Sequence, residues 1–160
     1  MNKIYIIGPV GSGKTTFSKE LSASYNIPCY ELDKVVWDDT NHVKRTDLEI
    51  NKLFQEILNN DSWIIEDVGR SKFYQGRAEA DIIYYLKMTK LKAYIRVIKR
   101  FLRQRSGKEE YNVFPDYKQL KYYLSIVSSY YKKENDKLKE LEEYSDKLVF
   151  DNTKKLSKKR

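Results

Sequence analysis

A glycine-rich segment near the N-terminus restricts the fold of this chain more than any other feature. Residues 8–15 read Gly-Pro-Val-Gly-Ser-Gly-Lys-Thr and fit the pattern G-x-x-x-x-G-K-[ST] without a mismatch. An apolar, β-like run at residues 4–7 precedes the segment, and a helical pattern follows it. A strand, a glycine turn and a helix in this order predict a loop whose backbone N–H groups surround phosphate oxygens.

Each residue type in the loop has a physical task. The helix that begins at Lys14 adds the partial positive charge of its N-terminus. The Lys14 ammonium can reach the β- and γ-phosphate oxygens, and the Thr15 hydroxyl can ligate Mg²⁺. The alternative is a glycine-rich turn that merely joins the strand to the helix. We expect ATP and Mg²⁺ as cofactors, with the nucleotide bound by Gly8, Gly11, Ser12, Gly13, Lys14, Thr15 and Thr16.

Length and composition indicate one domain. The chain has 160 residues, of which 41% are hydrophobic and 34% are charged, as in soluble globular proteins. No stretch approaches the roughly 20 apolar residues of a membrane span, and Lys3 leads directly into the first strand without a signal-peptide cleavage site. Cys29, the single cysteine, cannot form an internal disulfide, and His42, the single histidine, excludes a histidine-rich metal site. We expect a cytoplasmic protein with one domain over residues 1–153.

The net charge of +8 is concentrated at the C-terminus. Five basic residues and no acid lie in residues 154–160, which leaves 26 Lys and Arg against 23 Asp and Glu, or +3, for the rest. The body is therefore only mildly basic, and nucleic acid is a partner that this charge allows but does not favour. The tail is either a solvated terminus or a weak contact to nucleic-acid or membrane phosphates.

Short apolar runs alternate with helical periods, and this alternation predicts a parallel α/β fold. We expect strands at residues 3–7, 29–32, 63–66, 82–86 and 148–150. We expect helices from Lys14 onward and at residues 46–59, 90–105 and 116–141. Thr46 and Glu49 have the spacing of a capping box. The polar stretch between the last two helices is the predicted lid, at roughly residues 104–116.

The order of these elements resembles the adenylate-kinase-like branch of P-loop kinases. That resemblance implies a three-layer fold with a five-stranded parallel sheet and a short helical lid before the last strand. Residues 63–70 line up with the family's apolar strand and its Asp-Gly-Phe-Pro-Arg segment. Glu66 falls on the acidic strand-end residue and Arg70 on the substrate-binding arginine, whereas Asp67 stands where a glycine is usual.

Over the whole chain, the sequence resembles the bacterial DNA topology modulation proteins. The resemblance covers residues 1–105 well and the remainder loosely. The name of that family describes a cellular effect, and the fold that it implies is that of a small-molecule kinase. The segments that carry the resemblance are residues 4–16, 30–37, 61–66 and 80–83 and the arginine-rich helix that follows.

Acidic residues follow two of the predicted strands. Asp33 ends the second strand, at the sheet edge that lines a ligand crevice, and can order Mg²⁺-bound water or accept a proton. Its alternative role is a turn or helix N-cap. Glu66 and Asp67 point in different directions, so we expect one of them, Glu66, to face the metal or the acceptor. Trp37 lies where related kinases hold the acceptor, and it either stacks on a planar substrate or packs in the core.

The predicted helix at 90–105 combines an apolar stripe with a basic face. We expect it to bury the stripe made by Leu91, Tyr94, Ile95, Ile98 and Leu102. The basic face, which suits a polyphosphate, consists of Lys92, Arg96, Lys99, Arg100 and Arg103. The kinase resemblance makes Arg96 and Arg100 residues at the base of the lid, with Arg103 or Arg105 closing on the transferred phosphate. The alternative is a solvated basic face.

These features predict an ATP-dependent small-molecule kinase that acts on a nucleoside, a nucleotide or a similar metabolite. Arg70 favours an anionic acceptor, whereas Asp33 favours a hydroxyl acceptor that needs a base. The alternative is a nucleotide-binding regulator with a role related to DNA topology and no transferase activity. The predicted catalytic residues are Lys14, Asp33, Arg96, Arg100 and Arg103. The predicted acceptor-binding residues are Asp33, Trp37, Glu66 and Arg70, and the predicted Mg²⁺ ligands are Thr15 and Glu66, directly or through water.

Overall fold

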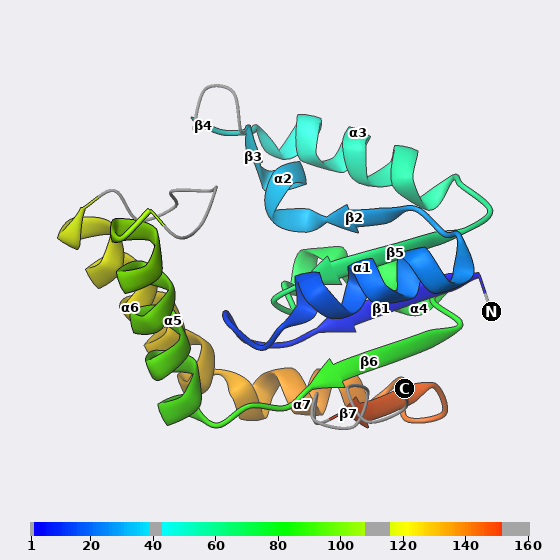
Figure 1. Cartoon of the computed structure of the whole chain (residues 1–160). Helices are drawn as coiled ribbons and strands as arrows, with labels where there is room; N and C mark the ends of the chain where they lie inside the picture. Colours follow the sequence, from blue (N-terminus) through cyan, green and yellow to red (C-terminus); the bar gives the residue numbers. More distant parts are fainter. Residues whose placement is uncertain (1, 39–42, 108–115, 152–160) are drawn as a thin grey trace.

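A five-stranded parallel sheet, with strands in the order β2-β5-β1-β6-β7, forms the centre of the molecule (Figure 1). The computed structural model describes residues 2–38, 43–107 and 116–151. The strands are β1 (Lys3–Ile7), β2 (Cys29–Glu31), β5 (Trp63–Asp67), β6 (Ile82–Leu86) and β7 (Leu148–Asp151). The predicted fold class, α/β with five parallel strands, is confirmed.

The register of the two central strands determines where the site lies. β1 pairs with β5 so that Ile6 lies opposite Glu66 and Ile7 lies opposite Asp67. Parallel strands end at the same edge of a sheet, so the loop that leaves β1 is adjacent to both acidic residues. The order of strands, with β1 between β5 and β6, thus brings the glycine loop and the acidic strand end together.

Helices cover both faces of the sheet, because alternate strand residues point to opposite sides. One face packs Ile4, Ile6 and Ile64 against Phe17 of α1 (Lys14–Tyr25). The other face packs Tyr5, Trp63 and Ile65 with the buried residues of α3 (Asp47–Leu58). Thr46 caps α3 as predicted: its hydroxyl accepts from the Glu49 N–H at 3.3 Å, and the Glu49 carboxylate accepts from the Thr46 N–H at 2.8 Å.

The predicted end of the second strand is wrong. β2 ends at Glu31, and Asp33 lies in the first turn of a short helix, α2 (Leu32–Val36). Leu32, Val35 and Val36 are all buried, and this i, i+3, i+4 spacing places three apolar side chains on one face of a helical turn. Asp33 is therefore displaced from the strand end but still lies beyond the carboxyl edge of β2.

Several short elements had no counterpart in the predicted pattern. β3 (Trp37–Asp38) pairs antiparallel with β4 (Val43–Lys44) in a small separate sheet. A 3₁₀ turn, η1 (Ser71–Phe73), leads into α4 (Tyr74–Glu79). Each of these elements is too short to give a periodic pattern in the sequence. Whether they form therefore depends on how they pack against the rest of the molecule.

The predicted helix at 116–141 is two helices, α6 (Tyr117–Lys132) and α7 (Glu134–Glu142), with Lys133 between them. α6 packs on α5 (Lys90–Arg105) through Val127, whereas Leu141 of α7 belongs to the core under the sheet. The chain has to turn between these two partners, and a single straight helix cannot reach both. Figure 1 shows the pair α5–α6 opposite the carboxyl ends of the strands.

The predicted buried stripe of α5 is wrong for four of its five residues. Ala93, Val97 and Phe101 form the buried face and pack with Val127 of α6. Of the predicted stripe, Tyr94 is partly buried and packs against this core, whereas the other four point outward and are exposed: Leu91, Ile95, Ile98 and Leu102. Both faces of α5 are apolar at helical spacing, so periodicity alone could not decide between them.

Three predicted features lie outside the described residues. They are the centre of the predicted lid at 108–115, the basic tail at 154–160, and His42. Among the described helices, none combines the length and the apolar character required to cross a bilayer.

Candidate functional site

The loop between β1 and α1 has the geometry of an anion-binding turn. Gly13 has a φ of 98°, in the left-handed region that side chains disfavour, and it immediately precedes α1. Gly8 is crowded, because a Cβ there would lie 2.7 Å from Ser12 Oγ and 3.0 Å from the Leu86 carbonyl oxygen. No side-chain hydrogen bond caps the N-terminus of α1, and its first turn holds no acid. α1 therefore supplies no carboxylate of its own to its N-terminal amides.

Lys14 folds back over this loop. Its Nζ donates to the Pro9 carbonyl oxygen at 3.2 Å. Burial lowers the pKa of Lys14, and the nearby carboxylates of Glu66, Asp33 and Asp67 act in the opposite direction. One ammonium is therefore placed within electrostatic reach of all three acids at the carboxyl edge of the sheet.

Thr15 and Glu66 form an oxygen-rich pair beside the loop. Thr15 Oγ1 donates to Glu66 Oε1 at 3.0 Å, and Ser18 Oγ donates to Glu66 Oε2 at 3.3 Å. Glu66 is only 6% exposed, and burial raises its pKa although Lys14 and the Thr15 hydroxyl oppose the shift.

A hydroxyl and a carboxylate are hard oxygen donors, so Thr15 and Glu66 fit Mg²⁺. Within the described ranges no group of three or more His, Cys, Asp or Glu side chains is placed to hold a metal ion. This donor set suits a Mg²⁺ ion that takes its other ligands from phosphates and water, as Mg²⁺ commonly does.

A second charged cluster lies at the end of β5. Arg70 donates through Nη1 to Asp67 Oδ1 at 2.5 Å and through Nη2 to Asp33 Oδ1. The Asp67 side chain is fully buried, whereas that of Asp33 is 64% exposed. Burial acts to lower the pKa of Arg70, but Asp67 and Asp33 outweigh burial and raise it. The cluster presents a fixed cation and an accessible carboxylate side by side. Asp67 and Glu66 point in different directions, as their adjacent positions on a strand predict.

Two cations, the partly buried Lys137 and the buried Arg77, hold the backbone that carries Arg70. Lys137 Nζ, from α7, donates to the Val68 carbonyl at 3.0 Å and to the Gly69 carbonyl at 2.5 Å. Arg77, from α4, donates to the Arg70 carbonyl at 3.0 Å and to the Ser71 carbonyl at 3.5 Å. We call these two side chains the loop clamp. Sequence reasoning missed it, because its partners are backbone carbonyls with no sequence signature.

α5 contributes arginines to the other side of the loop. Arg96 Nη1 donates to the Gly11 carbonyl at 2.7 Å, so α5 lies directly against the glycine loop. Burial raises the pKa of Tyr123 in α6, while the charges of Arg100 and Asp33 act on it in opposite directions. Arg100 and Asp33 thus both lie within electrostatic reach of one side chain.

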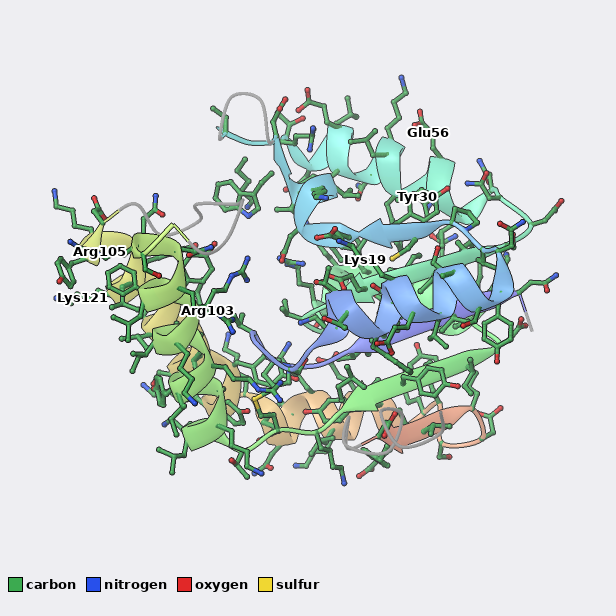
Figure 2. The ribbon with its side chains drawn as sticks, viewed as in Figure 1. Lys19, Tyr30, Glu56, Arg103, Arg105 and Lys121 are labelled. Carbon is green, nitrogen blue, oxygen red and sulfur yellow. The ribbon has the colours of Figure 1, made fainter. Side chains whose placement is uncertain are left out.

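Arg103 and Arg105 leave α5 on opposite sides (Figure 2). The Arg105 guanidinium lies 5.7 Å from the Phe101 ring centre and 4.9 Å from that of Tyr117. This cation–π stacking holds Arg105 against aromatic rings. Arg105 is one of the two arginines predicted to close on phosphate, and whether Arg103 or Arg105 does so stays a prediction.

Trp37 and Cys29 belong to the strands β3 and β2. Trp37 is on β3 and 41% exposed, and its carbonyl oxygen accepts from Arg45 Nη1 at 2.8 Å. Its stacking on an acceptor stays a prediction. Cys29 is half-buried, and burial raises the pKa of its thiol.

The sheet order and the glycine loop together define a P-loop α/β protein, a class whose fold implies nucleotide binding. Residues 4–113 match the model of the family AAA_18, described as an AAA domain. Because this match covers well over half of the chain, the protein belongs to the AAA_18 family.

Three solved structures with a similar course of the chain are described as a gluconokinase and two shikimate kinases. A gluconokinase from Sinorhizobium meliloti 1021 has 14% identity and a TM-score of 0.48, over 78% of this chain and 74% of its own. A shikimate kinase from Acinetobacter baumannii in complex with shikimate has 15% identity and a TM-score of 0.48, over 83% and 79%. A shikimate kinase from Bacteroides thetaiotaomicron has 14% identity and a TM-score of 0.46, over 81% and 97%. No curated protein sequence matches the chain.

Proposed function

We propose that the protein is an ATP-dependent phosphotransferase. It transfers the γ-phosphoryl group of Mg-ATP to a small acceptor, a nucleoside, nucleotide or similar metabolite, that binds at Asp33 and Arg70. One observation carries the proposal: β5 ends in two adjacent carboxylates, Glu66, which accepts from Thr15 beside the phosphate loop, and Asp67, which accepts from Arg70 in the cluster with Asp33. A phosphate site and an acceptor site at neighbouring strand ends are what phosphoryl transfer requires.

The residues of the loop bind and orient the nucleotide. The amides at the start of α1 and the Lys14 ammonium hold the β- and γ-phosphates, and Arg96 lies against the same loop. Thr15 and Glu66 hold Mg²⁺, which when bound neutralises phosphate charge. These groups place positive charge where negative charge accumulates during transfer.

The acceptor is bound by the second cluster. Arg70 binds an anionic group of the acceptor, and the exposed Asp33 carboxylate accepts the proton of its hydroxyl. The hydroxyl oxygen forms a bond to the γ-phosphorus, the bond to the β-phosphate oxygen breaks, and ADP leaves. Asp67 is fully buried, and its ion pair keeps Arg70 oriented. The anionic group of the acceptor replaces Asp33 as the second partner of Arg70.

Membership in the DNA topology modulation proteins, a finer assignment than the AAA_18 family, is part of the proposal. The resemblance to the DNA topology modulation proteins implies the same small-molecule kinase fold and adds no residue to the site. A DNA-binding regulator remains the competing function, and it predicts nucleotide binding without acceptor-dependent turnover.

Calorimetry with Mg-ATP, followed by an ADP-release screen over nucleosides, nucleotides and sugars, tests the proposal. We expect wild type to bind Mg-ATP and Lys14→Met to lose at least about 1.4 kcal/mol of binding free energy, a tenfold change in Kd. In the screen, we expect one class of acceptor to stimulate ADP release by wild type. Lys19→Met, an exposed lysine of the same helix, is the matched control. Absence of heat with wild type overturns the proposal. Binding without stimulation by any acceptor supports the regulator instead.

A further inference from the structure

α5 has an outward apolar face that the described part of the chain leaves exposed. Its inner face packs on α6, but Leu91 is 69% exposed and Leu102 is 58% exposed on the other side. Ile95 and Ile98 lie between them and are 41% and 40% exposed. Four large aliphatic side chains in one row on a helix surface form a contiguous patch of the kind that marks an interaction site. We call this row the outer seam.

The spacing of the outer seam identifies the shape of its occupant. The steps between its four residues are four, three and four positions, which is the a/d repeat of a coiled coil. An a/d row is narrower than the broad apolar face of a helix that lies in a lipid surface. A narrow row of this kind accepts the ridge of one facing helix.

The charges that flank the seam identify the chemistry of that helix. Lys92 and Lys99 follow Leu91 and Ile98 directly and occupy the positions that border such a seam. α5 holds seven basic residues and no acidic one: Lys90, Lys92, Arg96, Lys99, Arg100, Arg103 and Arg105. A helix of the same composition would place like charges against these lysines, which disfavours a second copy of this chain. Glutamates on a facing helix would pair with them.

We propose that the outer seam of α5 binds an acidic amphipathic helix of a partner protein. Leu91, Ile95, Ile98 and Leu102 interlock with the apolar row of that helix, and Lys92 and Lys99 pair with its flanking glutamates. The bound helix lies on the side of α5 opposite its buried face, so the packing of α5 on α6 is preserved.

A pair of synthetic helices tests the inference. The acidic probe carries Leu and Ile at a and d and Glu at e and g over about three heptads, and the basic probe carries Lys at e and g. Both are labelled, and their fluorescence anisotropy is followed during titration with the full chain. We expect saturable binding of the acidic probe, at least about tenfold tighter than the basic probe, and weaker at high salt.

Two variants separate the apolar and the charged contributions. Ile95→Ser with Ile98→Ser should weaken the acidic probe at least about tenfold while Mg-ATP binding stays unchanged. Lys92→Glu with Lys99→Glu should reverse the preference toward the basic probe. Leu48→Ser, at an exposed leucine on α3, is the matched control and should change nothing.

Three outcomes overturn the inference. The first is equal binding of both probes, or binding of the acidic probe that the two serine substitutions do not change. The second is a dimer in sedimentation that the same serine substitutions dissociate, which would make a second copy the occupant. The third is co-sedimentation with anionic phosphatidylserine vesicles without probe binding, which would make a lipid surface the occupant.

Discussion

At the scale of single residues, the three carboxylates near the strand ends differ in the groups that surround them. Glu66 is buried next to two hydroxyls, Asp67 is buried next to a guanidinium, and Asp33 is exposed beside the same guanidinium. The same functional group therefore has three environments within one small site. This separation suits one carboxylate for a metal, one for holding an arginine and one for a reacting proton.

Asp33 and Arg70 have separable roles in the proposed reaction. Asp33→Asn should lower kcat by about 10² to 10⁴ and change the KM of the acceptor little, because it removes a proton acceptor. Arg70→Lys should raise the KM of an anionic acceptor by at least about tenfold, because a lysine cannot bind bidentately. Steady-state kinetics with the acceptor found by the ADP-release screen checks both. Equal effects of the two substitutions on KM alone would contradict the assignment of Asp33 as a base.

Glu66 should give the affinity for Mg-ATP a pH dependence. Burial raises the pKa of this carboxyl above its ordinary value of 4.5, so it takes up a proton at a higher pH than an exposed glutamate does. A protonated carboxyl is a poor Mg²⁺ ligand, so the Mg²⁺-dependent part of the ATP affinity should fall as the pH is lowered toward that raised pKa. Calorimetry between about pH 5 and 8 with and without Mg²⁺ measures this. Glu66→Gln corrects for protonation of ATP itself, and a fall of the same size in this variant would exclude Glu66 as the cause.

At the scale of elements, α7 does more than complete the helical layer. Through Lys137 it holds the turn between β5 and η1, and through Glu140 it contacts both Ser71 Oγ at 3.0 Å and Arg77 at 3.7 Å. The break at Lys133 is what allows α6 to lie on α5 while α7 reaches this turn. The division of one predicted helix into two thus has a direct consequence for the position of Arg70.

Removal of the α7 half of the loop clamp should loosen that turn. Lys137→Met leaves the carbonyls of Val68 and Gly69 without their donor, and hydrogen bonds from charged groups contribute about 1.5–3 kcal/mol each. We expect a loss of about 1–3 kcal/mol in the free energy of unfolding and faster amide hydrogen exchange at 70–73. Denaturant unfolding and exchange measured by mass spectrometry check this. Lys139→Met, exposed on the same helix, should leave both unchanged, and an equal effect there would rule out the clamp.

At the scale of the whole molecule, the site lies where four parts of the chain meet. The glycine loop, α2, the end of β5 and α5 all contribute charged groups, among them Lys14, Asp33, Glu66 and Arg96. The sheet fixes the positions of the glycine loop, α2 and the end of β5 relative to one another, whereas α5 belongs to a helix pair with its own small core. A nucleotide that contacts all four parts should stabilise the fold as a unit.

Mg-ATP should raise the unfolding temperature of wild type. At about 100 times its Kd, a ligand that binds only the folded state adds about 2.7 kcal/mol of stability. For a chain of 160 residues this corresponds to a shift of about 5–10 °C. Thermal unfolding followed by circular dichroism measures it. Lys14→Met should show less than half of the shift, and an identical shift in both proteins would mean that the nucleotide binds elsewhere.

The sequence alone determined the phosphate loop and most regular elements, because their signals are local. A glycine pattern, a two-residue alternation or a 3.6-residue period is contained within one segment, and so the bounds of β1, β6 and α5 agree with those predicted. The pattern and the kinase resemblance also predicted Thr15, Glu66, Arg70 and Arg96 as site residues, and these assignments stay predictions.

The tertiary structure decided which groups meet and which face of a helix is buried. Asp33 and Arg70 are 37 residues apart, and Lys137 and Gly69 are 68 apart, so no local pattern relates them. α5 is apolar on two faces, and only the position of α6 determines that Ala93, Val97 and Phe101 are buried while the outer seam is exposed. Local periodicity reports that a side chain is apolar, but burial depends on which other element occupies the space beside it.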